Sequence, residues 1–173
     1  MSVKPIISAA EAVKFLQDGM TFVTTGFVAC QMPESTNKAI EKSFLETGHP
    51  RDLTLLYAAA QGNRDGSGAD HFAHEGLLKR VIGGHYNMVP ELGKLIFDNK
   101  LEAYNLPQGT ISQLFRDIAG HKLGTITHVG MNTFCDPRLQ VGKLNTKTTE
   151  DIVELVNIAG EERLLYKAQK IDV

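Results

Sequence analysis

The chain has 173 residues, of which 42% are hydrophobic and 22% charged, and its formal net charge at pH 7 is −2. This length supports one α/β domain with a sizeable core, and the lack of a basic excess argues against a nucleic-acid partner. The two cysteines, Cys30 and Cys135, lie far apart, which is no disulfide framework and suits a reducing cytoplasm. The sequence opens with no secretory signal pattern, and no apolar run approaches the ~20 residues of a membrane span, so we expect a cytoplasmic protein without a membrane partner.

Strands and helices alternate over the first two thirds of the chain. Ser8 and Glu11 form a capping box that begins the first helix. Short β-branched and aromatic runs bounded by glycine, proline or asparagine are typical of buried strands. We expect helices over 8–16, 33–45, 90–97 and 111–119, and strands over 20–27, 53–58, 81–84 and 101–105. This alternation predicts an α/β fold with an open, mostly parallel sheet and helices on both faces.

The last third of the chain is less regular. The segment 124–145 contains Pro137 and several glycines and is expected to have few clear elements, which hints at functional or interface use. The runs 152–158 and 163–168 flank a short turn and predict a C-terminal antiparallel hairpin. Residues 170–173 resemble a strand cut short. We therefore expect residues 1–173 to form a single domain that is part of a longer protein.

A rigid turn follows the strand expected over 101–105. Pro107 fixes its own φ and pushes Leu106 toward an extended conformation, and Thr110 is a plausible N-cap of the next helix. Gln108 is thereby placed at the carboxyl end of a strand, where open α/β sheets bind ligands. Its amide could donate a hydrogen bond to a carboxylate or an oxyanion. From the turn alone, a glutamine that faces water is the simpler interpretation.

Glycine-bearing turns follow three of the expected strands. In a parallel sheet, the turns at 26–28, 61–63 and 108–109 would gather at one edge, where glycine lets a ligand approach the backbone. The helix after Pro33 would aim free amides toward an anion. The sequence contains neither a dinucleotide-binding fingerprint nor a phosphate-loop lysine motif. Each turn taken singly is more simply explained as an ordinary connection.

The histidines are candidate metal ligands. His71 and His74 are three residues apart and Glu75 is adjacent, but a metal site would need a third well-spaced ligand. We interpret these histidines as structural or surface residues and predict no metal. His85 and His128 are single histidines that are expected to be hydrogen-bonded structural residues. Glu75 is expected to begin a helix after the glycine-rich loop.

Cys30 is a candidate nucleophile. It precedes a predicted helix, where a thiol would have a lowered pKa, but no histidine is placed beside it by the sequence. A small buried apolar role is the commoner alternative. Cys135 is interpreted as a packing residue.

Several motifs in the right order resemble the N-terminal half of the family I coenzyme A transferases, of the acetate/propionate and acetoacetate type. The matching stretches are 18–19, 25–27, 33–34, 72–85, 104–109, 133–138 and 142–145, and they span nearly the whole chain. Thr25, Gln31 and Val141 depart from the family pattern, which usually has glycine at these three positions.

The resemblance implies a ping-pong transfer of coenzyme A between short-chain carboxylic acids. A glutamate attacks an acyl-CoA thioester and becomes a glutamyl-CoA thioester, from which an incoming acid takes the coenzyme A. Gln108 maps onto the family's active-site glutamine, and Gly26, Phe27 and Gly109 onto the substrate pocket. The resemblance implies an acyl-CoA and a small carboxylate as substrates, with no permanent cofactor or metal.

The glutamate nucleophile of the family lies in the second half and does not map onto this chain. We therefore expect an N-terminal lobe that is truncated before a second lobe, inactive alone, and a homo-oligomer when complete. Two alternatives stay open: a sugar-phosphate isomerase on a related sheet, and a non-catalytic binding or assembly module.

Overall fold

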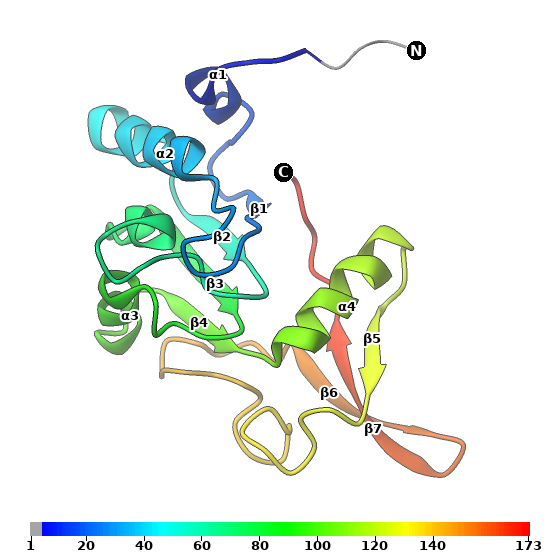
Figure 1. Cartoon of the computed structure of the whole chain (residues 1–173). Coiled ribbons are helices and arrows are strands. Elements are labelled where there is room, and N and C mark those ends of the chain that lie inside the picture. The colour runs from blue at the N-terminus through cyan, green and yellow to red at the C-terminus, as the bar shows by residue number, and fades with distance from the viewer. Residues whose placement is uncertain (1–4) are drawn as a thin grey trace.

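A four-stranded parallel sheet forms the centre of the computed structural model, which describes residues 5–173. Its strands are β1 (Thr21–Val23), β2 (Leu53–Leu56), β3 (Leu78–Gly83) and β4 (Glu102–Asn105). They follow one another in the order β1-β2-β3-β4, each parallel to its neighbour (Figure 1). The parallel sheet expected from the alternation of elements is confirmed. Parallel strands place all their carboxyl ends at one edge, which we call the carboxyl rim.

One face of this sheet is covered by helices. These are α1 (Ala9–Val13), α2 (Glu34–Thr47), the 3-10 helix η1 (Gly68–Phe72) and α3 (Pro90–Phe97). The Ser8–Glu11 capping box is present and begins α1. Alternate strand residues point to this face and form one hydrophobic core with the helices: Phe22, Leu55, Tyr57, Val81 and Ala103 from the sheet, and Ile40, Phe72 and Leu92 from the helices.

The opposite face is covered by α4 (Gln108–Ala119) and by a small antiparallel sheet. That sheet has the order β5-β7-β6, with β5 (Gly124–Thr127), β6 (Val153–Ile158) and β7 (Glu161–Lys167). A second hydrophobic core joins it to the parallel sheet through Leu56, Ile82, Tyr104, Ile111, Val153, Leu164 and Tyr166. Helices therefore lie on both faces, as expected, and the predicted hairpin of β6 and β7 is confirmed.

Two local predictions were wrong, and one strand was not predicted. The segment 124–145 contains that strand, β5, because Gly124–Thr127 pairs with β7 about forty residues later in the chain. Helix α4 begins at Gln108, so Thr110 lies inside the first turn and does not cap it. Glu75 lies in a turn before β3 rather than in a helix, and its carboxylate is 3.2 Å from the ammonium of Lys100.

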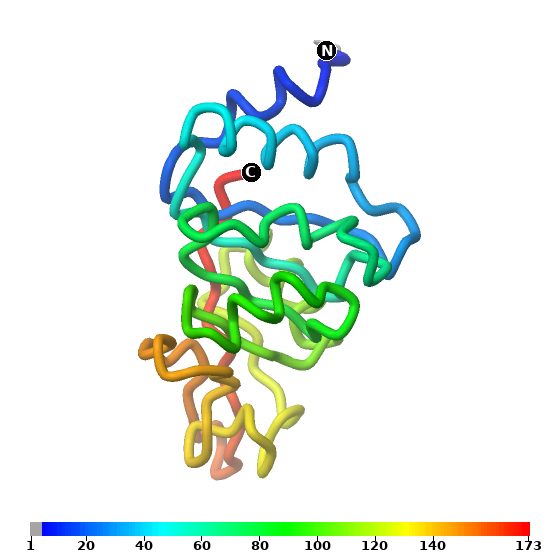
Figure 2. Tube along the Cα trace, turned by 90° about the vertical axis from the view of Figure 1, so that its left-hand side faces the viewer, coloured from blue at the N-terminus to red at the C-terminus, as the bar shows by residue number. Residues whose placement is uncertain are grey.

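The last residues of the chain run beside β1 (Figure 2). The backbone N–H of Asp172 donates to the carbonyl of Thr21 at 2.9 Å, and the N–H of Val23 donates to the carbonyl of Val173 at 3.0 Å. The Asp172 carboxylate also accepts from the N–H of Thr21. These bonds occupy the outer edge of β1, the first strand of the sheet. Across residues 5–173, no helix is both long and apolar enough to cross a membrane.

Candidate functional site

The candidate site is the carboxyl rim of the parallel sheet, where the loops after the four strands meet. Gln108 and Gly109 follow β4, and Gly26 and Phe27 follow β1. The two pairs therefore lie at opposite edges of the same rim. With about 4.8 Å between neighbouring strands, three intervals separate them by about 14 Å. A ligand that touches both pairs has to be extended, and the loops after β2 and β3 lie between them.

Gln108 is exposed at the rim, as the first residue of α4. Its side chain lies across Gly84, because a Cβ atom on Gly84 would be 2.2 Å from the Gln108 Cγ and 2.2 Å from the carbonyl oxygen of Ala58. Gly84 in turn donates its N–H to that carbonyl at 3.1 Å. The glutamine stem is thus seated on backbone that only glycine permits, between the ends of β2, β3 and β4. Gly109 is also exposed and has open space around it.

Two glycines, the last residue of β3 and the one that follows it, are required by close packing. A Cβ atom on Gly83 would meet the ring of Tyr57 at 2.6 Å, and one on Gly84 would meet Gln108. Tyr57 also donates its hydroxyl to the carbonyl of His85 at 3.0 Å. Burial raises the pKa of the Tyr57 phenol well above its ordinary value, so it remains a neutral donor. We had not assigned Gly84 or His85 to the site, although a Gly-Gly-His run directly after a strand was the available signal.

The loop after β1 is folded tightly against the loop after β2. Gly26 has a φ of +151°, and a Cβ atom there would lie 3.1 Å from the carbonyl oxygens of Cys30 and Gln31. Val28 donates to the carbonyl of Ala60 and accepts from Gly62, both at 3.0 Å. Phe27 is 61% exposed beside this junction. The predicted Gly26–Phe27 turn therefore lies at the rim, with an apolar ring available to a ligand.

A buried glutamine and a histidine lie between the two predicted pairs. Gln61 is 1% exposed, and neither of its side-chain amide atoms has a hydrogen-bond partner among residues 5–173. An unpaired buried amide is unfavourable for folding, so stability alone does not explain a glutamine here. The Nε2 atom of His85 lies 3.4 Å from the N–H of Ala60, which points to it as the acceptor. Neither Gln61 nor His85 was identified as a site residue from the sequence.

The irregular segment after β5 supports the Gln108 turn from behind. Asn105 donates its side-chain amide to the carbonyl of Gly84 at 2.8 Å, and its own N–H donates to the carbonyl of Gly142. Gly142 has a φ of +70°, and a Cβ atom there would be 2.8 Å from the carbonyl oxygen of Asn105. The motif at 142–145 thus fixes the end of β4, from which the turn begins.

An ion pair holds the same segment together. Asp136 is 1% exposed and accepts from the backbone N–H groups of Asn132 and Arg138 at 2.9 and 3.0 Å. The Arg138 guanidinium forms a bidentate pair with it, at 2.9 and 2.7 Å. These donors hold the pKa of the Asp136 carboxyl well below its usual range.

A cavity of about 750 Å3 lies elsewhere. Its walls come from the amino ends of the strands and include Thr21, Thr54, Leu78 and Glu102. A smaller hollow of about 250 Å3 lies beside Gly109, between α4 and β5. The candidate site is therefore defined by backbone geometry at an open rim rather than by an enclosed cavity.

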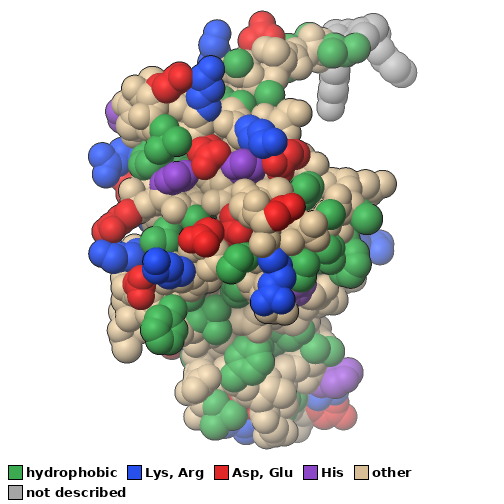
Figure 3. All heavy atoms as spheres, turned by 60° about the vertical axis from the view of Figure 1, so that its left-hand side comes forward, with side chains coloured by type: hydrophobic (Ala, Val, Ile, Leu, Met, Phe, Trp, Pro, Cys, Tyr) green, Lys and Arg blue, Asp and Glu red, His purple; other side chains and the backbone are tan. Residues whose placement is uncertain are grey.

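The histidines considered as metal ligands lie on the helical face instead. Histidine and acidic side chains are neighbours on this surface (Figure 3), and Glu41 contacts both His71 and His74, at 2.6 and 2.7 Å. Within residues 5–173, no group of three or more histidine, cysteine, aspartate or glutamate side chains is arranged to hold a metal ion. Cys30 is exposed in the loop after β1, not buried, and Cys135 is buried.

The rim presents the exposed Gln108 amide, a neutral donor and acceptor, and the unpartnered Gln61 amide and the His85 ring lie in the neighbouring loops. Such groups stabilise an oxygen that gains negative charge without adding a charge of their own. An anionic acyl or carboxylate oxygen is the kind of ligand that this arrangement suits.

Comparison with known proteins gives a consistent result. A family model described as Coenzyme A transferase matches residues 6–173. A caffeate CoA-transferase of Acetobacterium woodii is 42% identical over 167 residues, which is 96% of this chain and 32% of that protein. An acetate CoA-transferase, YdiF, of Escherichia coli (strain K12) is 37% identical over 170 residues, 98% of this chain and 32% of that protein.

Two solved structures of the acyl-CoA transferase YdiF from E. coli O157:H7 share the fold. The apoenzyme matches with a TM-score of 0.92 at 37% identity, and a thioester complex with CoA with 0.90 at 36% identity. Each match covers 95% of this chain and 32% of that chain. The chain spans about a third of the length of these relatives. The resemblance inferred from the motifs is confirmed: this chain belongs to the coenzyme A transferase family.

Proposed function

We propose that this chain is the N-terminal lobe of a short-chain acyl-CoA:carboxylate CoA-transferase and that Gln108 holds the reacting oxygen. The observation that carries this proposal is the position of the Gln108 amide, which is exposed at the carboxyl rim and seated over Gly84. The relatives are named as caffeate and acetate CoA-transferases, and one solved relative is a thioester complex with CoA.

The chemistry needs a nucleophile from a second lobe. A glutamate carboxylate there attacks the carbonyl carbon of the acyl-CoA thioester, and the carbon–sulfur bond breaks to release the CoA thiolate. The thiolate then attacks the glutamyl carbonyl of the resulting anhydride, which forms the glutamyl-CoA thioester and releases the first acid. An incoming carboxylate reverses both steps and leaves with the CoA. CoA is thus a substrate rather than a resident cofactor.

Gln108 acts on the oxygen that becomes negative in each of these steps. Its Nε2 hydrogens can donate to the acyl or carboxylate oxygen, and the amide remains neutral throughout. We assign Gly26, Phe27 and Gly109 to the walls of the substrate pocket. The exposed Phe27 ring supplies apolar surface at the far edge of the rim.

The proposed partners are a second, C-terminal transferase lobe and further copies of the assembled enzyme. Exposed apolar side chains between 124 and 145 support a covered surface there: Ile126, Val129, Phe134, Leu139 and Leu144. The two free cysteines fit a reducing cytoplasm, where we propose that the enzyme acts.

The test is CoA transfer after addition of the second lobe of the acetate CoA-transferase relative. Acetyl-CoA and propionate are supplied, and propionyl-CoA is followed. We expect Gln108→Ala to lower turnover by about 10²-fold, since one oxyanion donor is lost. The matched control is Gln113→Ala, which removes an exposed amide one turn further along α4. Unchanged turnover in the folded Gln108→Ala variant would contradict the role of this amide.

A further inference from the structure

We propose that His71 is a doubly protonated positioning residue that ties together the two loops of the carboxyl rim, so that the shape of the site depends on pH. Its consequence for catalysis rests on the proposed function, whereas its effect on the loops does not. The loops are 26–32, after β1, and 61–67, after β2, and we call them the first and second rim loops.

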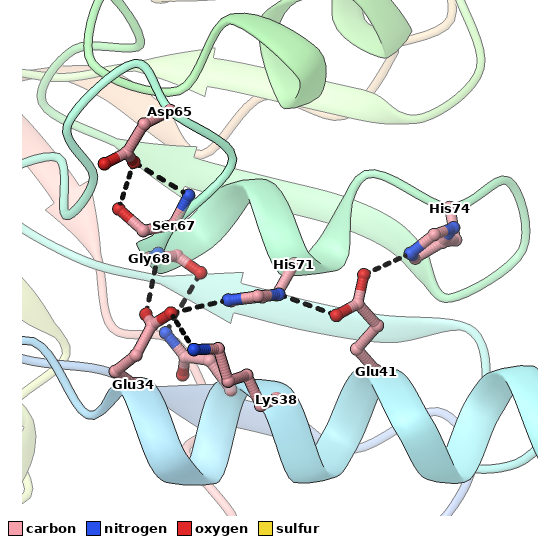
Figure 4. Close-up of polar contacts among 9 residues, drawn as sticks. Glu34, Lys38, Glu41, Asp65, Ser67, Gly68, His71 and His74 are labelled. Carbon is pink, nitrogen blue, oxygen red and sulfur yellow. Dashed lines mark hydrogen bonds and ion pairs between the residues drawn. The ribbon is translucent and has the colours of Figure 1, made fainter.

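The His71 ring lies between two carboxylates (Figure 4). Its Nδ1 atom is 2.6 Å from Glu41 Oε2, and its Nε2 atom is 2.8 Å from Glu34 Oε1. Ionised carboxylates only accept hydrogen bonds, so both ring nitrogens have to donate. A neutral imidazole has one N–H and would turn a lone pair toward one carboxylate. The geometry therefore calls for the imidazolium.

The charges around His71 favour this form. From α2, Glu34 and Glu41 face the ring, and Lys38 Nζ lies 3.2 Å from Glu34 Oε1. On the other side, His74 Nε2 is 2.7 Å from Glu41 Oε1. The Lys38 ammonium balances the charge of Glu34. The His71 imidazolium then balances the charge of the second carboxylate, Glu41.

The 3-10 helix η1, which carries His71, contributes one more acidic residue. Asp70 in η1 precedes His71, and its Oδ1 accepts from the N–H groups of Glu91 and Leu92 at the start of α3. The Glu91 carboxyl is a further charged neighbour of Asp70. The His71 side chain is 11% exposed. Burial alone would lower its pKa, but hydrogen bonds to Glu34 and Glu41 outweigh burial and raise it above the ordinary value of 6.5.

Glu34 connects this ring to both rim loops. It directly follows Pro33, where the first rim loop ends and α2 begins. Its second oxygen, Oε2, accepts the backbone N–H of Gly68 at 2.9 Å, and Gly68 ends the second rim loop. Asn37, also in α2, donates to the carbonyl of Gly68 at 3.1 Å. The bases of the two loops are thus joined through one carboxylate that His71 orients.

The other ends of the two loops are also joined. Val28 and Gln61 form a parallel bridge, with backbone bonds of 3.0 Å to Ala60 and Gly62. The two loops are therefore connected twice. Backbone bonds at Val28 and Gln61 join them near the rim, and the Glu34 side chain joins their bases. Only the connection at the base depends on protonation of His71. Loss of the His71 proton would set a lone pair against a carboxylate and weaken the base connection.

The direction with pH follows from the raised pKa. The stabilisation from His71 is fully present below about pH 6.5, the value in the unfolded chain, and is lost as pH rises through the higher value of the folded chain. The rim loops are therefore expected to be held together at neutral pH and to loosen on the alkaline side.

The experiment uses the chain as it is and needs no turnover. Histidine ring signals are followed by NMR against pH, with His71→Gln identifying the His71 signal. In parallel, hydrogen exchange gives protection factors, relative to intrinsic rates, for the Gly68 amide and both rim loops. We expect His71 to titrate above its ordinary range. Protection should fall about tenfold or more across the same pH interval, since a hydrogen bond to a charged group is lost.

His74→Gln is the matched control. It removes a histidine from the same Glu41 carboxylate but touches neither Glu34 nor Gly68, so rim-loop protection should stay within about twofold of the parent. In His71→Gln, protection of the Gly68 amide and the rim loops should be as low at every pH as it is in the parent at alkaline pH. If that variant does not fold, Glu34→Gln replaces it, and it should lower the pKa of His71.

The inference is overturned if His71 titrates at or below the ordinary histidine range, or if loop protection does not follow its titration. Equal losses of rim-loop protection in the His71→Gln and His74→Gln variants would also overturn it, because the cluster would then have only a general packing role. An inactive assembled enzyme would contradict the proposed function and leave these results unaffected.

Discussion

The two ends of the parallel sheet differ in chemistry. At the amino end, a cavity of about 750 Å3 is lined by charged side chains, among them Arg51, Glu75, Lys79, Lys100 and Glu102. At the carboxyl rim, the residues of the candidate site are glycine, glutamine, phenylalanine and histidine. The larger hollow therefore lies opposite the proposed site.

The charges at the amino end are largely engaged with one another. Arg80 lies 2.5 Å from Glu102 and 2.6 Å from Glu150, and its guanidinium is 5.7 Å from the centre of the Tyr104 ring. Lys100 pairs with Glu75 at 3.2 Å. These pairs hold the beginnings of the strands together. At the rim, Gly84 and Gln108 are held by close packing against backbone, and the Gln108 amide stays exposed.

The largest expected effect is at the rim. Gly84→Ala would place a methyl group 2.2 Å from the Ala58 carbonyl oxygen and from Gln108 Cγ, so the free energy of unfolding should fall by about 3 kcal/mol. Gly109→Ala is the control, because its surroundings are open and its φ is not positive; it should raise stability by up to about 1 kcal/mol. Urea unfolding measures both variants, and equal stabilities would show that the rim does not depend on close packing at Gly84.

A smaller effect is expected behind the rim, at Asp136. Asp136→Asn removes a charge that four donors share and should cost about 2 kcal/mol at pH 7. The pKa of Asp136 is lowered on folding, so its contribution is present above about pH 4 and is lost as pH falls. The difference between the parent and the variant should therefore shrink in acid. The control Asp98→Asn, at an exposed position after α3, should cost less than about 0.5 kcal/mol at pH 7.

The smallest effect is expected at the amino end. Arg80→Gln should lower stability by about 1 kcal/mol, because Glu150 is exposed while Arg80 and Glu102 are partly buried, and the loss should decrease at about 1 M salt. Rim-loop hydrogen exchange should not change. Lys42→Gln, which breaks an exposed pair with Glu46, should have an effect below about 0.5 kcal/mol. Loosened rim loops in the Arg80 variant would show that the two ends are not independent.

Much of the fold could be predicted because its signals are local. The Ser8 capping box and the apolar strand runs depend on neighbours a few residues away, and they predicted the parallel sheet. The short strand β5 could not be predicted, since Gly124–Thr127 is extended only through its pairing with β7. Thr110 was a reasonable cap by composition, but Pro107 already allows the helix to begin at Gln108.

The site was predicted in part. Pro107 and Gly109 predicted where Gln108 lies, and its exposure at the rim agrees with that prediction, whereas its role remains a proposal. The spacing of His71 and His74 was visible, but their carboxylate partners lie thirty or more residues earlier, and no local pattern identifies them.

Two departures from the family pattern have a structural counterpart. Gln31 and Val141, which stand where glycine is usual, have φ values of +58° and +59°. This is the left-handed region that favours glycine, and side chains occupy it at a cost of about 1–2 kcal/mol. The backbone of both turns is therefore kept here despite the change of residue.

The bonds between the last residues and β1 also bear on how this protein is handled. The outer edge of a sheet with free N–H and carbonyl groups is a template for strand addition from another molecule. In this chain, Asp172 and Val173 occupy those groups on Thr21 and Val23. A substitution at Asp172 or Val173 made for labelling has to leave those bonds intact, or it uncovers an edge prone to aggregation.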